Sequence, residues 1–194
     1  MKKIITISRE FGAGGGEIGR KVAKALNYNY YDKEIIIEAA REANIDVESM
    51  LRWDEKVPMN FGFAQSLFDF YNKPLSEKLF DALQQIIKEI GEKGNCVIVG
   101  RNGNTILKEF ENGLHVYVHA DPHWRLERMK QEMTDTSDAK LSEQIRMIDK
   151  MRKKYCQYYT NTEFGVSDYY DISMNTSKLG IDTCVDIICN LAKQ

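Results

Sequence analysis

The chain has 194 residues, a length typical of one domain rather than two or three. Its composition, 43% hydrophobic and 29% charged, is that of an ordinary globular protein and argues against a disordered or membrane-spanning chain. The formal net charge is -2, so no overall basic field attracts nucleic acid or an anionic membrane. Any recognition of anions must therefore be local.

The hydrophobic pattern predicts strands that alternate with helices. In chain order we expect a strand at 4–8, a helix at 17–26, a strand at 28–31, a helix near 35–40, a helix at 75–90 that stops at Gly91 and Gly94, strands at 96–99 and 114–119, a helix carrying Arg125 and Arg128, a helix at 139–159, a strand near 170–174 and a helix at 181–191. Residues 44–74 predict a mobile helical insert. The alternation implies a mainly parallel sheet covered by helices on both faces.

The cysteines and histidines do not follow a zinc-binding pattern. The four cysteines contain no C-x-x-C pair, and His115, His119 and His123 lie four residues apart on a predicted strand and turn. The apolar run in the first ten residues is too short for a signal peptide, and no stretch approaches the roughly 20 apolar residues of a membrane helix. We therefore expect a cytoplasmic protein without a membrane or nucleic-acid partner.

Five glycines fall within eight consecutive residues directly after the first predicted strand: Gly12, Gly14, Gly15, Gly16 and Gly19. Glycine between a strand and a helix lets backbone N–H groups point inward, and the helix N-terminus adds positive charge, so the pattern predicts an anion site. Three interpretations compete. A dinucleotide-binding G-x-G-x-x-G is present but begins late after the strand, a P-loop lacks its lysine, and a simple turn needs fewer glycines.

Positive charge and polar side chains gather where this sheet would bind a ligand, beyond the carboxyl ends of its strands. The first strand ends at the glycine loop, the third at Gly100-Arg101, and the fourth leads to Asp121, Arg125 and Arg128. Residues 1–33 contain seven basic and three acidic residues, and residues 146–154 contain five basic and one acidic. The remainder of the chain is acidic, so these two segments predict a local phosphate site.

These residues resemble the cytidylate kinase-like family, a branch of the P-loop nucleoside monophosphate kinases. The likeness rests on segments that follow one another along nearly the whole chain: Ile5–Arg20, Tyr30–Lys33, Val97–Arg101, His115–Val118, Arg125–Arg128, Asp149–Arg152, Tyr158–Thr160 and Asn175–Ser177. It implies an α/β, three-layer P-loop NTPase fold with a mainly parallel five-stranded sheet, in a single domain over residues 1–194. It also implies a helical monophosphate-binding insert at about 33–75 and a helical lid at about 134–160.

The resemblance places ATP phosphates on the segment formed by Gly12, Ala13, Gly14, Gly15, Gly16, Glu17 and Ile18. Cytidylate kinases have G-A-G-K-G-T here, so Gly15 stands in place of the phosphate-binding lysine and Glu17 in place of the hydroxyl residue that holds Mg²⁺. Of the cations nearby, Arg9, Arg20 and Lys21, we favour Arg9 as the substitute, because charge on the transferring phosphate must be offset. Glu17 either meets Mg²⁺, directly or through water, or is an acidic first-turn residue favoured by the helix dipole.

The other implied site residues lie further along the chain. Asp32 begins the monophosphate-binding segment, and Arg101 matches an arginine that grips the acceptor phosphate by a bidentate fork. Asp149 and Arg152 form a D-x-x-R of the lid, in which arginine clamps phosphates and the acid orients it or the base. Arg128, on the same helix face as Arg125, is a third candidate catalytic arginine, with a solvated surface charge as the alternative.

The resemblance implies an ATP- and Mg²⁺-dependent phosphotransferase whose acceptor is CMP or a related nucleoside monophosphate. The missing lysine supports a second hypothesis, a nucleotide-binding sensor with little or no catalysis. A Rossmann-type NAD-binding oxidoreductase is disfavoured by the position of the glycine loop. One further alternative concerns assembly: the aromatic residues of 61–71 pack either under the lid or against a second copy in a homodimer.

Overall fold

A computed structural model describes residues 1–32, 41, 77–134 and 136–194. Within these ranges the strands form one five-stranded sheet: β1 (Ile4–Arg9), β2 (Asn29–Tyr31), β3 (Cys96–Val99), β4 (Gly113–His119) and β5 (Ile172–Asn175). The order is β2-β3-β1-β4-β5 and every pairing is parallel, which confirms the predicted sheet. A dinucleotide-binding fold with strand order 3-2-1-4-5-6 places β1 beside β2. Here β3 separates them, which argues against the oxidoreductase alternative.

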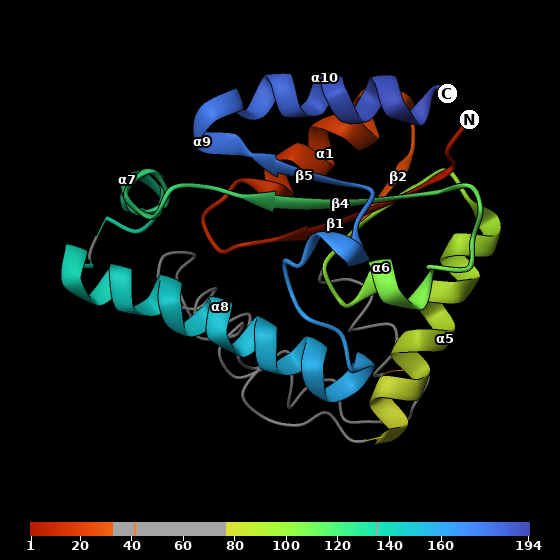
Figure 1. Cartoon of the computed structure of the whole chain (residues 1–194), viewed down its shortest axis with the longest axis horizontal. Coiled ribbons are helices and arrows are strands. Elements are labelled where there is room, and N and C mark those ends of the chain that lie inside the picture. Colours follow the sequence, from red (N-terminus) through yellow and green to blue (C-terminus); the bar gives the residue numbers. More distant parts are fainter. Residues whose placement is uncertain (33–40, 42–76, 135) are drawn as a thin grey trace.

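The register places the carboxyl ends of the three central strands side by side. Ile7 of β1 pairs with Val99 on one side and with Val116 on the other. The segments that follow β1, β3 and β4 therefore leave the sheet at the same edge, away from the two ends of the chain (Figure 1). Because the loops at this edge come from neighbouring strands, residues far apart in the sequence meet there.

Helices cover both faces of the sheet (Figure 1). Helices α1 (Gly15–Leu26) and α10 (Ile181–Ala192) lie on one face, and α5 (Glu77–Lys93) and the short α6 (Gly103–Ile106) lie on the other. Helix α7 (Pro122–Glu132) lies at the carboxyl edge, and α8 (Asp138–Thr160) runs from there below the sheet toward α5 (Figure 1). A 3-10 turn, η1 (Ser167–Tyr169), and the short α9 (Thr176–Leu179) flank β5. This is the three-layer arrangement that the sequence predicts.

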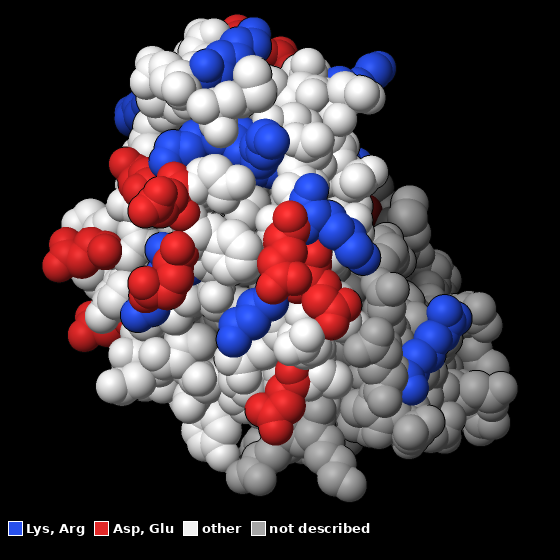
Figure 2. Space-filling view, turned by 90° about the vertical axis from the view of Figure 1, so that its right-hand side faces the viewer, with Lys and Arg blue, Asp and Glu red and all other residues white. Residues whose placement is uncertain are grey.

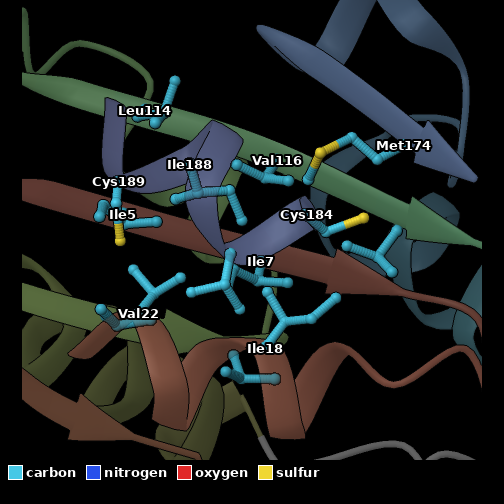
Figure 3. Packing of buried hydrophobic residues seen from close by; sticks show 14 of the residues in the cluster. Ile5, Ile7, Ile18, Val22, Leu114, Val116, Met174, Cys184, Ile188 and Cys189 are labelled. Carbon is cyan, nitrogen blue, oxygen red and sulfur yellow. The ribbon is translucent and has the colours of Figure 1, made fainter. Parts of the chain in front are cut away.

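Alternation along β1 divides the core between the two faces, because successive side chains of a strand point to opposite sides. Ile5 and Ile7 are fully buried against α1 and α10, where they meet Ile18 and Ile188 (Figure 3). Ile4 belongs to the opposite cluster, which is completed by buried leucine and isoleucine side chains of α5. Full burial of one such side chain contributes about 1.5 to 3 kcal/mol.

A third apolar cluster joins the carboxyl edge to α7 and α8. It contains Phe11, which follows β1, and a stripe of buried side chains from the two helices, Met129, Met133, Leu141, Ile145, Ile148, Met151 and Tyr155. The spacing of this stripe on α8 matches the apolar face predicted for 139–159. Phe11 therefore ties the start of the glycine loop to both helices.

Two details differ from the sequence predictions. The sequence predicts a stop at Gly91 and Gly94; α5 continues through Gly91 to Lys93 and ends before Gly94, which has a φ of +68°. Gly91 is needed for packing, since a Cβ there would lie 2.7 Å from Cδ2 of Leu107. The helices α6 and α9 are not predicted, because four-residue helices leave too short a pattern to detect.

Several predictions lie outside the described residues. These are the helix near 35–40, the insert at about 33–75 and the aromatic run of 61–71 with its homodimer alternative. In the parts of the chain that the structure describes, no helix is long and apolar enough to cross a membrane.

Charged side chains of both signs are interspersed on the face that includes the two chain ends (Figure 2). The described part of this face therefore presents no extended patch of one charge. The arginines described below gather instead at the carboxyl edge of the sheet.

One cross-strand pair makes the stability of the fold depend on pH. His115 of β4 lies opposite Thr6 of β1, with 2.8 Å between Nδ1 and Oγ1, and burial lowers the pKa of His115. The unfolded chain binds a proton near pH 6.5, so it holds more protons than the folded chain below that pH. We expect the free energy of unfolding to fall as the pH drops from 7 to 5, and to fall less in His115→Gln.

Urea denaturation of both proteins across this pH range measures the effect. His123→Gln is the matched control, because His123 is exposed on α7 and should leave the wild-type pH dependence intact. An unchanged pH dependence in His115→Gln would contradict the assignment to this histidine.

Candidate functional site

The glycine loop forms an open helix N-terminus at the end of β1. Gly12 and Gly14 have φ values of +79° and +85°, which a residue with a Cβ rarely adopts. Gly14 is the N-cap of α1 and offers no side-chain cap, so the first-turn N–H groups have no such partner in the described structure. Donors of this kind, with the positive end of the helix dipole, suit a phosphate.

Most of the predicted phosphate-binding segment lies in this loop, but Ile18 does not contribute to it. The Ile18 N–H donates to the Gly14 carbonyl at 2.9 Å, and its side chain is fully buried in the core. Since neither group is available to a ligand, we leave Ile18 out of the site. Gly12, Ala13, Gly14, Gly15, Gly16 and Glu17 remain.

Arg9, the last residue of β1, lies across the loop and is only 8% exposed. Its side chain runs beside Gly15, and its guanidinium reaches Gly100, at the end of β3. The Nη2 atom lies 3.5 Å from Oδ1 of Asp32, which follows β2. The structure thus brings together two predicted site residues, Arg9 and Asp32, from the ends of two strands.

Asp32 is also held by its own strand. The hydroxyl of Tyr30 donates to Oδ2 of Asp32 at 3.2 Å, and burial raises the pKa of Tyr30 to about 12, so this group stays protonated at neutral pH. Tyr30 in turn lies under the guanidinium of Arg20, 5.8 Å from the ring centre. Arg20 is exposed and stacks on this ring, whereas Arg9 is buried at the loop.

The turn after β3 holds its backbone in an unusual conformation. Gly100, Arg101 and Asn102 have φ values of +79°, +56° and +54° in succession. A left-handed residue other than glycine costs about 1 to 3 kcal/mol, and such strain concentrates at functional sites. Arg101 is 4% exposed, so its charge is largely removed from water at the edge where Arg9 lies.

The next residue fixes this turn to α8. The thiol of Cys156 donates to Oδ1 of Asn102 at 2.9 Å. Burial raises the pKa of Cys156 to about 12, which keeps the thiol protonated and able to donate. Asn102 therefore has a structural partner on α8.

Glu17 and Arg128 form an ion pair at the rim of the loop. Oε2 of Glu17 accepts from Nη2 of Arg128 at 2.7 Å, and Oε1 lies 2.9 Å from Nζ of Lys21. The hydrogen bond from Lys21 and the contacts with Arg128 lower the pKa of Glu17. Arg128 also lies near Gly14, because a Cβ there would be 3.9 Å from its Cζ. Arg128 is thus a cation beside the loop rather than a solvated surface charge.

These contacts bear on Mg²⁺. Both oxygens of Glu17 already face a cation, so a direct bond to a metal ion requires the loss of one of these contacts. Within the described ranges, no group of three or more His, Cys, Asp and Glu side chains is placed to hold an ion. The contacts of Glu17 with Arg128 and Lys21 agree with the interpretation of Glu17 as an acidic first-turn residue.

Asp149 and Arg152, from the predicted lid, contact the segment between β1 and the loop. Oδ1 of Asp149 accepts from the Phe11 N–H at 2.7 Å, and its Oδ2 pairs with Arg125. Nη1 of Arg152 donates to the Arg9 carbonyl at 2.7 Å, and its guanidinium lies 5.7 Å from the Phe11 ring centre. Their predicted roles toward phosphates and the acceptor stay predictions.

Two further residues shape the loop: Thr176, for which the sequence predicts no role, and Arg125, which the sequence places at the carboxyl edge without a role in the site. Oγ1 of buried Thr176 lies within hydrogen-bonding distance of two carbonyls, that of Ala13 at 2.9 Å and that of His119 at 3.2 Å, and so joins the loop to the ends of β4 and β5. Arg125 donates to the Phe11 carbonyl at 3.1 Å. Thr176 directly follows the last strand, β5, and so lies at the carboxyl edge where ligands bind in such sheets; this position is the sequence feature that indicates it.

Comparison with solved structures shows the same fold in several kinases. An uncharacterized protein from Eubacterium ventriosum is 27% identical, with a TM-score of 0.70 and 98% of each chain covered. Shikimate kinase from Bacteroides thetaiotaomicron is 15% identical, with a TM-score of 0.55 and 98% of each chain covered. Shikimate kinase from Acinetobacter baumannii, bound to shikimate, is 14% identical, with a TM-score of 0.52 and coverage of 97% of this chain and 92% of that one. The chain has the P-loop kinase fold.

Sequence comparison adds two findings. Uronate isomerase from Corynebacterium glutamicum is 27% identical over 105 residues, which is 54% of this chain. The chain spans about a fifth of the length of that curated relative, since the match covers 20% of it. A sequence profile described as the cytidylate kinase-like family matches residues 4–178, which run from the first strand, β1, to helix α9 after the last strand, β5. On this match, the chain belongs to the cytidylate kinase-like family.

Proposed function

We propose that this protein is a phosphotransferase that moves the γ-phosphoryl group of ATP to a nucleoside monophosphate, CMP or a related pyrimidine nucleotide. The observation that carries the proposal is the pair of buried arginines, Arg9 and Arg101, at the ends of the adjacent strands β1 and β3. Arg9 lies beside an uncapped helix N-terminus. Two buried cations next to a phosphate-binding loop suit a reaction between two phosphate groups.

The proposed reaction needs little acid–base chemistry. An ionised oxygen of the acceptor phosphate forms a bond to the γ-phosphorus of ATP, and the bond from this phosphorus to the bridging oxygen breaks. The electron pair leaves on the oxygen of ADP, and the acceptor becomes a nucleoside diphosphate. Such a transfer is accelerated by positioning and by charge neutralisation. Buried arginines and helix N–H groups supply both.

The site residues divide between the two nucleotides in this proposal. The triphosphate of Mg²⁺-bound ATP lies on Gly12 to Glu17, with Arg128 at the rim. The acceptor phosphate lies at Arg101, with Asp32 beside it. The charge of Arg101 and its strained turn support this assignment. Asp149 and Arg152 support the loop from α8, and their direct contact with phosphates remains part of the proposal.

A specific observation also supports the second hypothesis, a nucleotide-binding sensor. The loop has no lysine, and the residue in place of its Mg²⁺-binding hydroxyl is an acid held by Arg128 and Lys21. A protein that binds nucleotides without transfer would retain nucleotide affinity and show no turnover. We propose a cytoplasmic location for either function, supported by four cysteines that are all buried and free.

Arg101 provides the main test of the acceptor site. In a coupled ADP-release assay with ATP and a panel of nucleoside monophosphates, we expect turnover with a pyrimidine acceptor. Arg101→Ala should lower kcat/KM for the acceptor about 100-fold, because a buried charged hydrogen-bond donor is lost. The KM for ATP should change little.

Two variants make this result specific. Arg101→Lys keeps the charge but not the fork, and should recover part of the loss. Lys108→Ala removes an exposed cation from the chain segment that follows Arg101 and should behave as wild type. Nucleotide binding without turnover would favour the sensor, whereas turnover unaffected by Arg101→Ala would refute the acceptor assignment.

Glu17→Gln separates the two interpretations of this acid. If Glu17 only holds Arg128 and Lys21, the Mg²⁺ concentration for half-maximal activity should stay within about twofold of wild type, while kcat/KM for ATP falls. Loss of a metal ligand would instead raise that concentration about tenfold or more. Asp182→Asn is the control, because Asp182 also pairs with Lys21 but is exposed on α10.

A further inference from the structure

The loop lacks the usual lysine, and the structure shows what lies at that position instead. A Cβ on Gly15 would lie 2.6 Å from Cβ, 2.8 Å from Cγ and 3.5 Å from Cδ of Arg9. Contacts below 3.0 Å with the rigid base of a side chain are not tolerated without movement. Arg9 therefore occupies the space that any side chain at position 15 would need.

A second glycine accommodates the far end of the same side chain. A Cβ on Gly100 would overlap with Nη1 of Arg9 and would lie 3.0 Å from Cζ. Gly100 also has a φ of +79°, which disfavours other residues. The stem of Arg9 thus passes one glycine, and its guanidinium passes another at the end of β3.

The remaining contacts hold Arg9 in this position. Its backbone carbonyl accepts a hydrogen bond from buried Arg152, and its Nη2 lies 3.5 Å from Asp32. Arg9 is 8% exposed, and a charge buried to this extent is stable only with partners such as Asp32. The Arg9 side chain lies between Gly15 of the glycine loop and Gly100 at the end of β3, beside the loop that the proposed function assigns to the ATP phosphates.

We propose that Arg9 is the catalytic cation that replaces the P-loop lysine, and that Gly15 and Gly100 are the space that makes this replacement possible. The inference rests on the proposed function. It assigns to β1 a charge that the usual loop carries on its helix. Arg9 and a side chain at position 15 are mutually exclusive, so the two positions should behave as one exchangeable unit.

The exchange can be tested directly with four variants: Arg9→Gly, Arg9→Lys, Gly15→Lys and the double variant Arg9→Gly with Gly15→Lys. Arg9→Gly should lower kcat about 100-fold or more, as expected for the loss of a transition-state donor. Gly15→Lys alone should lower the melting temperature, because its Cβ collides with Arg9. The double variant should melt near wild type and regain at least about tenfold of the kcat lost in Arg9→Gly.

Arg9→Lys keeps the charge without the planar fork and should lie between wild type and Arg9→Gly. Lys24→Ala is the matched control, because it removes an exposed cation from the same helix as Gly15 and should retain wild-type activity. Circular dichroism melting of each variant separates loss of activity from loss of folding. An Arg9→Gly protein that folds and keeps kcat within about threefold of wild type would overturn the inference.

A binding measurement distinguishes this failure from failure of the proposed function. If wild type transfers no phosphoryl group to any nucleoside monophosphate, the proposed function is wrong. Calorimetric titration with a non-hydrolysable ATP analogue then decides the role of Arg9. Weaker binding in Arg9→Gly and recovery in the double variant support the inference, whereas unchanged affinity in Arg9→Gly overturns it.

Discussion

The inner face of α8 fixes both turns of the candidate site. Asp149 and Arg152 bond to the backbone at Phe11 and Arg9, and Cys156 bonds to Asn102 after β3. These three helix residues are separated by three and four positions, so they lie on one face. A glycine-rich loop has little side-chain packing of its own, and a left-handed turn is strained. Both therefore depend on buried bonds from this helix.

This attachment constrains how the predicted lid can act. Closure by a free helix would leave the loop unchanged, whereas α8 shares a buried apolar cluster with Phe11 and bonds to both turns. Any movement of α8 toward a nucleotide would move the backbone at Arg9 and Asn102 as well. The position of α8 and the shape of the candidate site are therefore coupled. A lid that closes in this way would bring the site residues into their working positions.

The fold was predictable because its signals are local. Short apolar runs predict the bounds of β1, β3 and β4 to within one or two residues. Asp121 before Pro122 indicates the start of α7, where the Asp121 carboxylate accepts hydrogen bonds from two backbone N–H groups. The predicted stop at Gly91 was wrong, because glycine is required there by close packing against Leu107, which lies outside α5, and not by the end of the helix. Strand order was equally hidden, since only the structure shows that β3 separates β1 from β2.

The candidate site was predictable in its location and less so in its chemistry. Edge geometry brings Arg9 and Asp32 together, and it places Arg101 after the neighbouring strand β3. The partners of Glu17 were not readable, because Arg128 lies 111 positions away and a first-turn acid has the same sequence signature whether it binds a metal or a cation. Thr176 is missed for a similar reason: its two acceptors, Ala13 and His119, belong to other strands' ends.

The source of the cation determines what it can do. A lysine on the first turn of α1 would be a flexible point charge that follows the loop. Arg9 instead starts from the central strand, is buried, and presents a planar fork between the glycine loop and the end of β3. A guanidinium between these two segments can donate to phosphate oxygens on two sides, whereas a lysine ammonium is a single point charge. A chain with a net charge near zero thus places one buried arginine, Arg9, at a rigid edge of the sheet. Gly15 of the glycine loop and Gly100 after β3 leave the space that the Arg9 side chain occupies.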